Sequence, residues 1–260
     1  MLLEGRIGPR FQEEAYRVLR SNLLVVLSDL ERPTVMVTSS DAGEGKTSTA
    51  VNLAYSLALA GQRVVLVDLD LHHPDVHRWV GIHNEVGASD VLLDRRPIDE
   101  CLQYVELAAD PVRPRGLYVM GTGPRVADPA ELLGMRRTSG MLESLAAQAD
   151  VVLVDTPPVL LVADALVLGR MTAGALLVVE AGRTPVAAIE HAKDALIRNQ
   201  TRLLGVVLNK FKLKDSPDSG YGRYGYYGDG YGTPYGDDSD GALSANGPTV
   251  VGLSDDHDRP

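Results

Sequence analysis

The sequence predicts an α/β fold in which a mostly parallel sheet is flanked by helices. Short runs rich in Val and Leu recur along the chain, and continuous apolar runs suit parallel strands that are buried on both faces. Longer helical segments lie between them, and strands that alternate with helices predict crossover connections and a parallel sheet. A Gly-rich segment at residues 40–47 joins one predicted strand to the next helix.

The elements follow one another in a regular order. A helix comes first, and a β-branched, apolar strand at 34–38 follows it. Gly61 is well placed to end the next helix. Residues 86–104 are expected to be helical in pieces that Pro97 separates. The remaining alternation gives predicted strands at 34–38, 63–68, 117–121, 151–155, 175–180 and 203–208, and predicted helices at 12–30, 46–60, 128–148, 164–171 and 185–200.

Residues 40–47, S-D-A-G-E-G-K-T, are typical of a phosphate-binding loop whose first position is Ser instead of Gly. Gly residues let backbone N–H groups approach phosphates, because no Cβ intervenes. Lys46 is expected to reach the β- and γ-phosphates, and Thr47 to place its hydroxyl on Mg²⁺. The helix that follows directs its positive dipole end at the same anion. The residues expected at the nucleotide are Gly43, Glu44, Gly45, Lys46, Thr47 and Ser48.

Aspartates stand at the ends of two further predicted strands. Asp68 ends one, with Asp70 two residues on, and Asp155 ends the other. Ligands of open α/β sheets bind beyond the carboxyl ends of strands, so these carboxylates should face Lys46. A single aspartate there is more often a turn residue or a helix cap, but the phosphate loop in the same chain favours an ATP and Mg²⁺ site. The predicted metal ligands are Thr47, Asp68 and Asp155, and the predicted catalytic residues are Lys46, Asp68, Asp70 and Asp155.

Composition limits the remaining possibilities. The 260 residues are 45% hydrophobic, enough for one sizeable core, and the net charge of −10 argues against a nucleic-acid partner. Cys101 is the single cysteine, which suits a reducing cytoplasm. The first residues lack a signal-peptide pattern, and Asp164 interrupts the longest apolar run, 159–168. We therefore expect a cytoplasmic protein, and if it works at the inner face of the membrane, another chain must recruit it there.

The chain changes character near residue 212. We expect an N-terminal helix at 1–30, an ATPase domain at 31–211, and a disordered tail at 212–260 that is rich in Gly, Tyr, Asp and Ser. Four basic residues and nine aspartates give this tail a charge of −5. Composition alone leaves two interpretations, an adhesive low-complexity tract or a phosphoacceptor substrate. Six of the ten tyrosines lie here: Tyr221, Tyr224, Tyr226, Tyr227, Tyr231 and Tyr235.

With these motifs the chain resembles bacterial tyrosine kinases of capsular and exopolysaccharide synthesis, which are built on a MinD-like P-loop NTPase fold. Residues 40–47 are similar to the family's Walker A motif, 65–74 to its Walker A′ motif, and 151–158 to its Walker B motif. The segment 121–133 resembles the family's G-P-x-P-P-N-P-x-E-L-L stretch. In the segment G-V-V-L-N-K, Asn209 resembles the residue that lies near the adenine.

The resemblance implies an ATP- and Mg²⁺-dependent autokinase that phosphorylates its own tail tyrosines, and other protein substrates, to regulate polysaccharide synthesis and export. Asp68 and Asp70 would orient the incoming tyrosine, accept its proton late, or assist the metal. The pattern Glu14, Arg17 and Arg20, spaced by three along one helix, resembles a motif that joins subunits into a ring. A membrane-embedded polysaccharide co-polymerase would be the activator.

The chain departs from the family at one motif and leaves two alternatives open. His72 and His73 stand where the family usually carries arginines. One alternative is a MinD/ParA-like ATPase switch. Such proteins carry a lysine where this chain has Asp41, and MinD proteins end in a basic membrane helix, whereas this chain has a polar, acidic tail. The other is a catalytically silent scaffold that binds ATP and acts in polysaccharide export by assembly alone.

Overall fold

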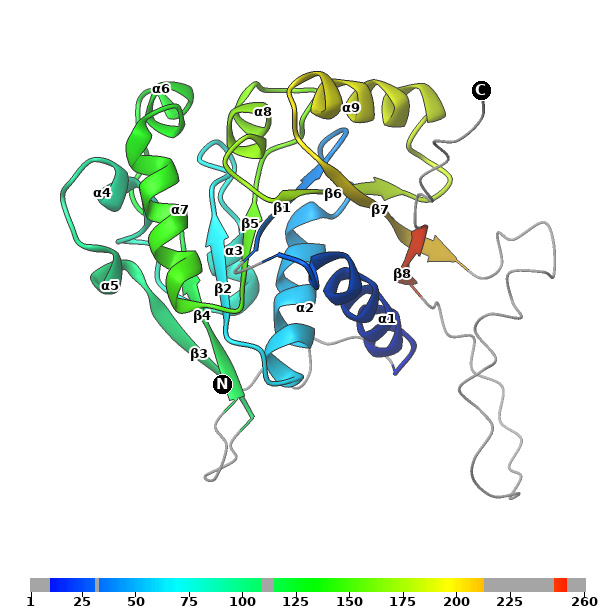
Figure 1. Cartoon of the computed structure of the whole chain (residues 1–260), viewed down its shortest axis with the longest axis horizontal. Helices are drawn as coiled ribbons and strands as arrows, with labels where there is room; N and C mark the ends of the chain where they lie inside the picture. The colour runs from blue at the N-terminus through cyan, green and yellow to red at the C-terminus, as the bar shows by residue number, and fades with distance from the viewer. Residues whose placement is uncertain (1–9, 31–32, 109–114, 213–245, 252–260) are drawn as a thin grey trace.

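The computed structural model describes residues 10–30, 33–108, 115–212 and 246–251. Its centre is a twisted sheet of eight strands in the order β3-β4-β2-β5-β1-β6-β7-β8 (Figure 1). All neighbouring strands are parallel except the outermost pairs, β3 with β4 and β7 with β8. The strands are β1 Thr34–Ser39, β2 Val64–Asp68, β3 Gln103–Ala108, β4 Arg115–Met120, β5 Val151–Asp155, β6 Gly174–Glu180, β7 Leu203–Lys212 and β8 Asn246–Val251.

Helices cover both faces of the sheet. One apolar cluster joins α1, α2 and α3 to one face, and a second joins the remaining helices to the other. The helices are α1 Arg10–Leu27, α2 Lys46–Leu59, α3 Val76–Val80, α4 Ala88–Leu92, α5 Ile98–Cys101, α6 Pro129–Leu133, α7 Arg136–Gln148, α8 Asp164–Gly169 and α9 Val186–Arg198.

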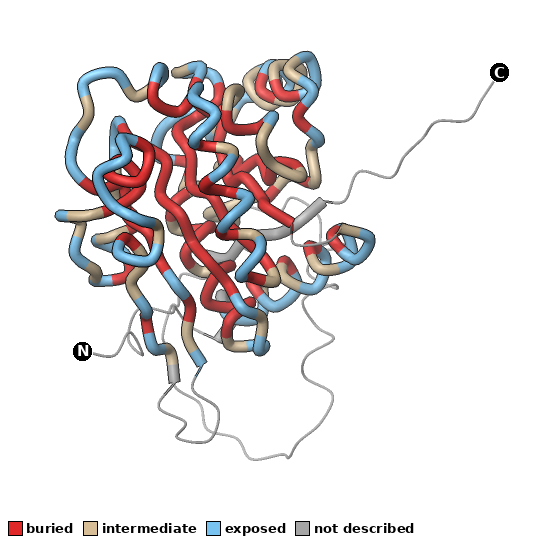
Figure 2. The backbone as a smooth tube through the Cα atoms, turned by 60° about the vertical axis from the view of Figure 1, so that its left-hand side comes forward, coloured by how far each residue is buried: buried red, intermediate tan, exposed pale blue. Residues whose placement is uncertain are grey.

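The central strands are buried on both faces, as their continuous apolar runs predict. In β1, Val35 and Val37 pack toward α1 and α2, whereas Met36 between them packs toward the other helices. Successive side chains of a strand point to opposite faces, so an uninterrupted apolar run supplies both cores. Figure 2 shows these strands as buried, with exposed residues on the outer surfaces of the helices.

Most predicted elements are confirmed within a few residues, but the outer strands differ from the prediction. Residues expected to continue a helix as far as Tyr104 instead form β3 from Gln103. This strand pairs with β4, and the Tyr104 ring packs on Tyr118 with centroids 5.3 Å apart. Tertiary pairing therefore decides the conformation here. Strand β8 lies within the segment expected to be disordered, and its Thr249, Val250 and Val251 are β-branched residues that favour strands.

Two helical predictions also change. The single helix expected at 128–148 is two helices, because the chain leaves α6 at Gly134 and adopts an extended conformation at Met135 before α7 begins. The short helix α3 was not predicted. It begins after Asp75, in the segment that follows β2 and its terminal Asp68.

Candidate active site

The phosphate loop connects β1 to α2 at the carboxyl edge of the sheet. Gly43 and Gly45 both have left-handed backbones, with φ of 81° and 95°. A Cβ at Gly43 would meet no atom within 4 Å, whereas a Cβ at Gly45 would lie 2.1 Å from Nδ2 of Asn209. Both glycines are therefore required by their conformation, and a side chain at Gly45 would also displace the Asn209 amide.

Ser40 and Glu44 brace the loop from within. The Ser40 hydroxyl lies 2.8 and 2.9 Å from the two Glu44 carboxylate oxygens, and the Asp41 N–H donates to Glu44 at 2.9 Å. The hydroxyl of Thr184, which precedes α9, donates to the same carboxylate. Glu44 was predicted to contact the nucleotide, but its carboxylate faces these three donors. Ser40, the unusual first residue of the loop, thus donates to a carboxylate of the same loop.

Residues of β7, with the last residue of β6, hold the loop from outside. Asn209 Nδ2 donates to the Glu44 carbonyl at 2.9 Å, which places this residue against the phosphate loop. Lys210 Nζ donates to the Gly43 carbonyl at 2.6 Å and lies 2.9 Å from Glu180 Oε2. The sequence did not single out Lys210, Glu180 or Thr184, because their contacts join segments far apart in the chain.

The structure brings together the lysine and the carboxylates that the sequence nominated. Lys46 Nζ lies 2.8 Å from Asp70 Oδ2 and 3.8 Å from Asp155 Oδ2. The Thr47 hydroxyl donates to Asp155 Oδ2 at 2.7 Å. The register explains the convergence, since Asp68 and Asp155 are opposite each other at the ends of neighbouring strands β2 and β5.

The cluster contains three carboxylates and one ammonium group, all largely buried. Burial raises the pKa of Asp155 to about 6, although Lys46 and Thr47 act in the opposite direction. Burial and then the charge of Asp155 hold the pKa of Asp68 well above its usual range. Burial lowers the pKa of Lys46, but the carboxylates of Asp155 and Asp70 outweigh it, so the net shift is upward. The cluster is therefore short of positive charge.

Asp68 has a structural task that the sequence did not predict. Its Oδ2 accepts from the backbone N–H groups of Asp75 and Val76 at 3.2 and 3.1 Å, where α3 begins. Its Oδ1 accepts from the Asp70 N–H at 3.1 Å. Both oxygens therefore shape the loop after β2, and the predicted role of Asp68 as a metal ligand stays a prediction.

Thr47 and Asp155 fit a divalent cation. Asp155 Oδ1 is buried and has no hydrogen-bond partner among the described residues. Oxygen ligands and a deficit of positive charge are what Mg²⁺ requires, and it completes its shell with water and phosphate oxygens. Within the described ranges, no group of three or more His, Cys, Asp or Glu side chains is placed to hold a metal by itself.

The loop after β2 also carries the departure from the Walker A′ pattern. His72 Nε2 lies 2.9 Å from Oδ2 of Asp164, the first residue of α8. The neighbouring His73 donates its backbone N–H to Asp70 Oδ1 at 2.9 Å. The sequence did not predict the pairing of His72 with Asp164.

The predicted oligomerisation residues on α1 do not act alike. Glu14 and Arg17 form an exposed pair with an N–O distance of 3.3 Å. Arg20 instead donates to the Ser56 carbonyl on α2 at 2.9 Å. Packing of α1 on α2 thus gives the Arg20 guanidinium an acceptor within the subunit, and the role of the three residues in oligomerisation stays a prediction.

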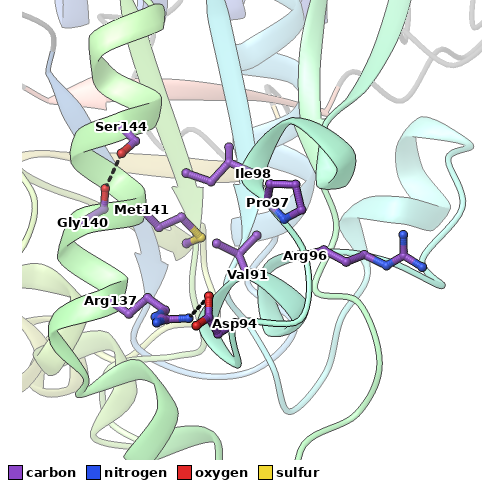
Figure 3. Close-up of a pocket in the computed structure, with 9 residues that line it drawn as sticks. All are labelled: Val91, Asp94, Arg96, Pro97, Ile98, Arg137, Gly140, Met141 and Ser144. Atoms are coloured by element: carbon purple, nitrogen blue, oxygen red, sulfur yellow. Dashed lines mark hydrogen bonds and ion pairs between the residues drawn. The ribbon is translucent and has the colours of Figure 1, made fainter.

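A cavity of about 350 Å³ lies elsewhere, between α7 and the segment that joins α4 to α5 (Figure 3). Its charged residues are already paired, Arg137 with Asp94 at 2.6 Å and Arg96 with Glu100 at 3.0 Å. None of its lining residues belongs to the phosphate loop or to the aspartate cluster.

Comparisons with known proteins agree with this geometry. A family model described as "ParA: NUBPL iron-transfer P-loop NTPase" matches residues 32–221. Tyrosine-protein kinase YwqD of Bacillus subtilis is 37% identical over 83% of this chain and 86% of its own length. The chain belongs to the bacterial tyrosine-protein kinases. The kinase domain of the Escherichia coli tyrosine kinase ETK superposes with a TM-score of 0.69 at 29% identity, covering 75% of this chain and 73% of that one.

The fold of this kinase is also that of the septum site-determining protein MinD. MinD of Pyrococcus horikoshii, crystallised with Mg-ADP, superposes with a TM-score of 0.58 at 20% identity, covering 69% of this chain and 70% of that one. In the described part of the kinase, no helix has the length and apolar character needed to cross a bilayer.

Proposed function

We propose that this kinase transfers the γ-phosphoryl group of ATP to tyrosine side chains, and first to the six tyrosines between 221 and 235 of its own chain. The observation that supports this is the convergence of Lys46, Asp70 and Asp155 beside the phosphate loop. It occurs in a chain whose relatives are tyrosine-protein kinases.

The proposed roles follow from the nature of phosphoryl transfer. The transition state is loose, so catalysis consists mostly of positioning and charge neutralisation. Backbone N–H groups at Gly43 and Gly45 would contact the phosphates, and Lys46 would exchange a carboxylate partner for a phosphate oxygen. Thr47 and Asp155 would hold Mg²⁺, which supplies positive charge to the phosphates. Asn209, against the loop at Glu44, is the proposed neighbour of the adenine.

The proposed acceptors lie outside the described residues. A phenol with an ordinary pKa near 10 is mostly neutral at pH 7, so its proton has to leave during the transfer. We propose that the tyrosines of one subunit enter the site of the next subunit in a homo-oligomeric ring. The exposed Glu14 and Arg17 of α1 are the proposed contacts between subunits.

The proposed setting is the synthesis and export of a capsular or extracellular polysaccharide. A relative in Staphylococcus aureus, the putative tyrosine-protein kinase CapB, is 27% identical over 83% of this chain. A membrane-embedded co-polymerase would hold the kinase at the inner face of the membrane and activate it. Other proteins with accessible tyrosines would be substrates, and the net charge of −10 makes nucleic acid an unsuitable partner.

The test is phosphotyrosine formation by the purified full chain with Mg·ATP. Lys46→Ala should abolish the signal. A variant with Phe in place of all six tail tyrosines should lose autophosphorylation, yet still bind ATP and phosphorylate an added tyrosine peptide. ATP hydrolysis without any phosphotyrosine would instead support the MinD/ParA-like switch. ATP binding with neither reaction would support the scaffold.

A further inference from the structure

The ladder between β7 and β8 shifts register once, between Leu208 and Phe211. Two residues of β7, Asn209 and Lys210, lie there opposite one residue of β8, Pro248. Two residues opposite one is the count that defines a β-bulge. Proline has no backbone N–H to donate to a ladder, so within sheets it is found at edges and bulges. The sequence of β8 thus suits the bulge that it faces.

The bulge gives Lys210 an uncommon backbone conformation. Its φ is 57°, in the left-handed region that residues with a Cβ seldom adopt. Such a conformation persists only where the surrounding structure determines it. Here the ladder with β8 lies on one side, and on the other Lys210 Nζ contacts the Gly43 carbonyl and Glu180. Lys210 is thus held from both sides.

The bulge also directs two neighbouring side chains at the same loop. Asn209 Nδ2 donates to the Glu44 carbonyl at 2.9 Å, and Lys210 Nζ donates to the Gly43 carbonyl at 2.6 Å. In a regular strand successive side chains point to opposite faces of the sheet, so two neighbours would not both be directed at one loop. The Lys210 N–H donates in turn to Asn209 Oδ1 at 2.9 Å, which turns the amide nitrogen toward the phosphate loop. The orientation of both side chains therefore depends on the irregular backbone.

We propose that strand β8 is part of the nucleotide site, because it fixes the bulge that aims Asn209 and Lys210 at the phosphate loop. It is the outermost strand on this side of the sheet and lies beside α1 (Figure 1). Without β8, the end of β7 would be a free edge, and Lys210 would be free to return to an ordinary strand conformation. One of the two side chains would then turn away from the loop. This inference rests on the ATP site of the proposed function and adds an element to it.

The peptide groups of the loop connect these two donors to the phosphates. In a planar trans peptide, the C=O of one residue and the N–H of the next point in opposite directions. Holding the carbonyls of Gly43 and Glu44 outward therefore directs the N–H groups of Glu44 and Gly45 to the inner side of the loop. Backbone N–H groups are the donors with which such a loop binds phosphate. Asn209 and Lys210 are thus positioning residues for the phosphates, and Asn209 is also the proposed neighbour of the adenine.

The experiment measures the Kd for Mg·ATP of the full chain and of two truncated forms. Removal of residues 246–260 should raise the Kd roughly tenfold, the effect expected from losing about one hydrogen bond. Removal of residues 252–260 leaves β8 in place, so it is the matched control and should give the Kd of the full chain. Each variant is assayed at a temperature at which circular dichroism shows it to be folded.

A further variant keeps β8 but removes the bulge. One alanine inserted after Pro248 places two residues opposite Asn209 and Lys210, so the ladder becomes regular. This insertion should raise the Kd as much as the removal of 246–260 does. The same insertion after Leu253, beyond the last pair of the ladder, should leave the Kd unchanged.

A double-mutant cycle separates positioning from a general loss of stability. Asn209→Ala combined with Lys210→Met removes both donors and should itself raise the Kd for Mg·ATP. In that background, removal of residues 246–260 should cause no further loss, because the strand acts through these two side chains. A strand that only supported the fold would give additive losses.

Three results would each overturn the role of β8 while leaving the kinase function intact: an unchanged Kd after removal of residues 246–260, an insertion without effect, or additive losses in the cycle. Absence of phosphotyrosine together with the expected Kd values would overturn the proposed function and still support the role of β8. Failure of the full chain to bind Mg·ATP would overturn both.

Discussion

At the scale of single residues, Asp155 combines a functional position with an unfavourable charge. Its Oδ1 is buried without a partner among the described atoms, and its pKa is raised to about 6. A carboxyl whose pKa is higher in the folded protein than its ordinary value near 3.9 contributes stability that is fully present below pH 3.9. This contribution is lost as the pH rises through 6. Asp155 should therefore make the nucleotide-free protein less stable at pH 8 than at pH 4.

Asp155→Asn should consequently raise the free energy of unfolding of the nucleotide-free protein at pH 8 by about 1–3 kcal/mol, and should change little at pH 4. Urea unfolding in EDTA at both pH values measures this. The same variant should lose the increase in Tm that Mg·ATP gives the wild type. A variant less stable than the wild type at pH 8 would contradict the charge argument.

Asp150, the residue before β5, provides a control because its pKa is shifted in the opposite direction. Its carboxylate accepts hydrogen bonds from the Arg63 side chain and backbone, which lower its pKa. Stability from this group is present above its ordinary pKa and is lost as the pH falls. Asp150→Asn should therefore destabilise the protein at pH 8 and have a smaller effect in acid.

Cys101 should be unreactive in the folded protein. It ends α5, is 1% exposed, and burial raises the pKa of its thiol to about 11. Thiolate is the reactive form, so little is present at pH 8. Iodoacetamide at pH 8 should modify Cys101 slowly in buffer and completely in urea, as mass spectrometry would show. Rapid modification of the native protein would contradict the packing described.

At the scale of elements, the positions of the strand ends predict which residues form the centre of the site. They predict few of the residues that support the phosphate loop. Lys46, Asp70 and Asp155 could be placed together because parallel strands bring their carboxyl ends to one edge. The braces of the loop, Thr184 and Lys210, could not be predicted, because their contacts depend on how β6 and β7 are placed relative to β1. The pairing of His72 with Asp164 was missed for the same reason.

The predicted secondary structure fails for a related reason at β3. The pairing of Gln103–Ala108 with β4 is what identifies this segment as a strand. The buried strand Val151–Asp155 was placed correctly, because an apolar β-branched run ending in aspartate leaves little ambiguity.

The phosphate loop allows a matched pair of substitutions. Gly43→Ala and Gly45→Ala both force alanine into a left-handed conformation, which costs about 1–2 kcal/mol. Only the Cβ at 45 would also collide with Asn209. Gly45→Ala should thus be more destabilising in urea unfolding and should displace the Asn209 contact, with a larger loss of ATP affinity. Equal effects of the two variants would show that this contact is unimportant.

At the scale of the whole molecule, phosphorylation should oppose assembly. Each phosphate adds about −1.5 to −2 charge, so six would add roughly −9 to −12 to a segment already at −5. Such a segment should be repelled from a neighbour's acidic site. Sedimentation should find the unmodified protein oligomeric and the phosphorylated protein mainly monomeric. The same mass in both states would contradict this prediction.

Strand β8 changes how the acceptor tyrosines are attached. The backbone pairs Lys212 with Asn246 and Phe211 with Gly247, so residues 213–245 leave and return to the sheet at one place. A span fixed at both ends reaches at most half its contour, roughly 55 Å at about 3.4 Å per residue. A recipient catalytic centre must therefore lie within that radius of the β7 terminus, which restricts transfer to immediate neighbours in an assembly.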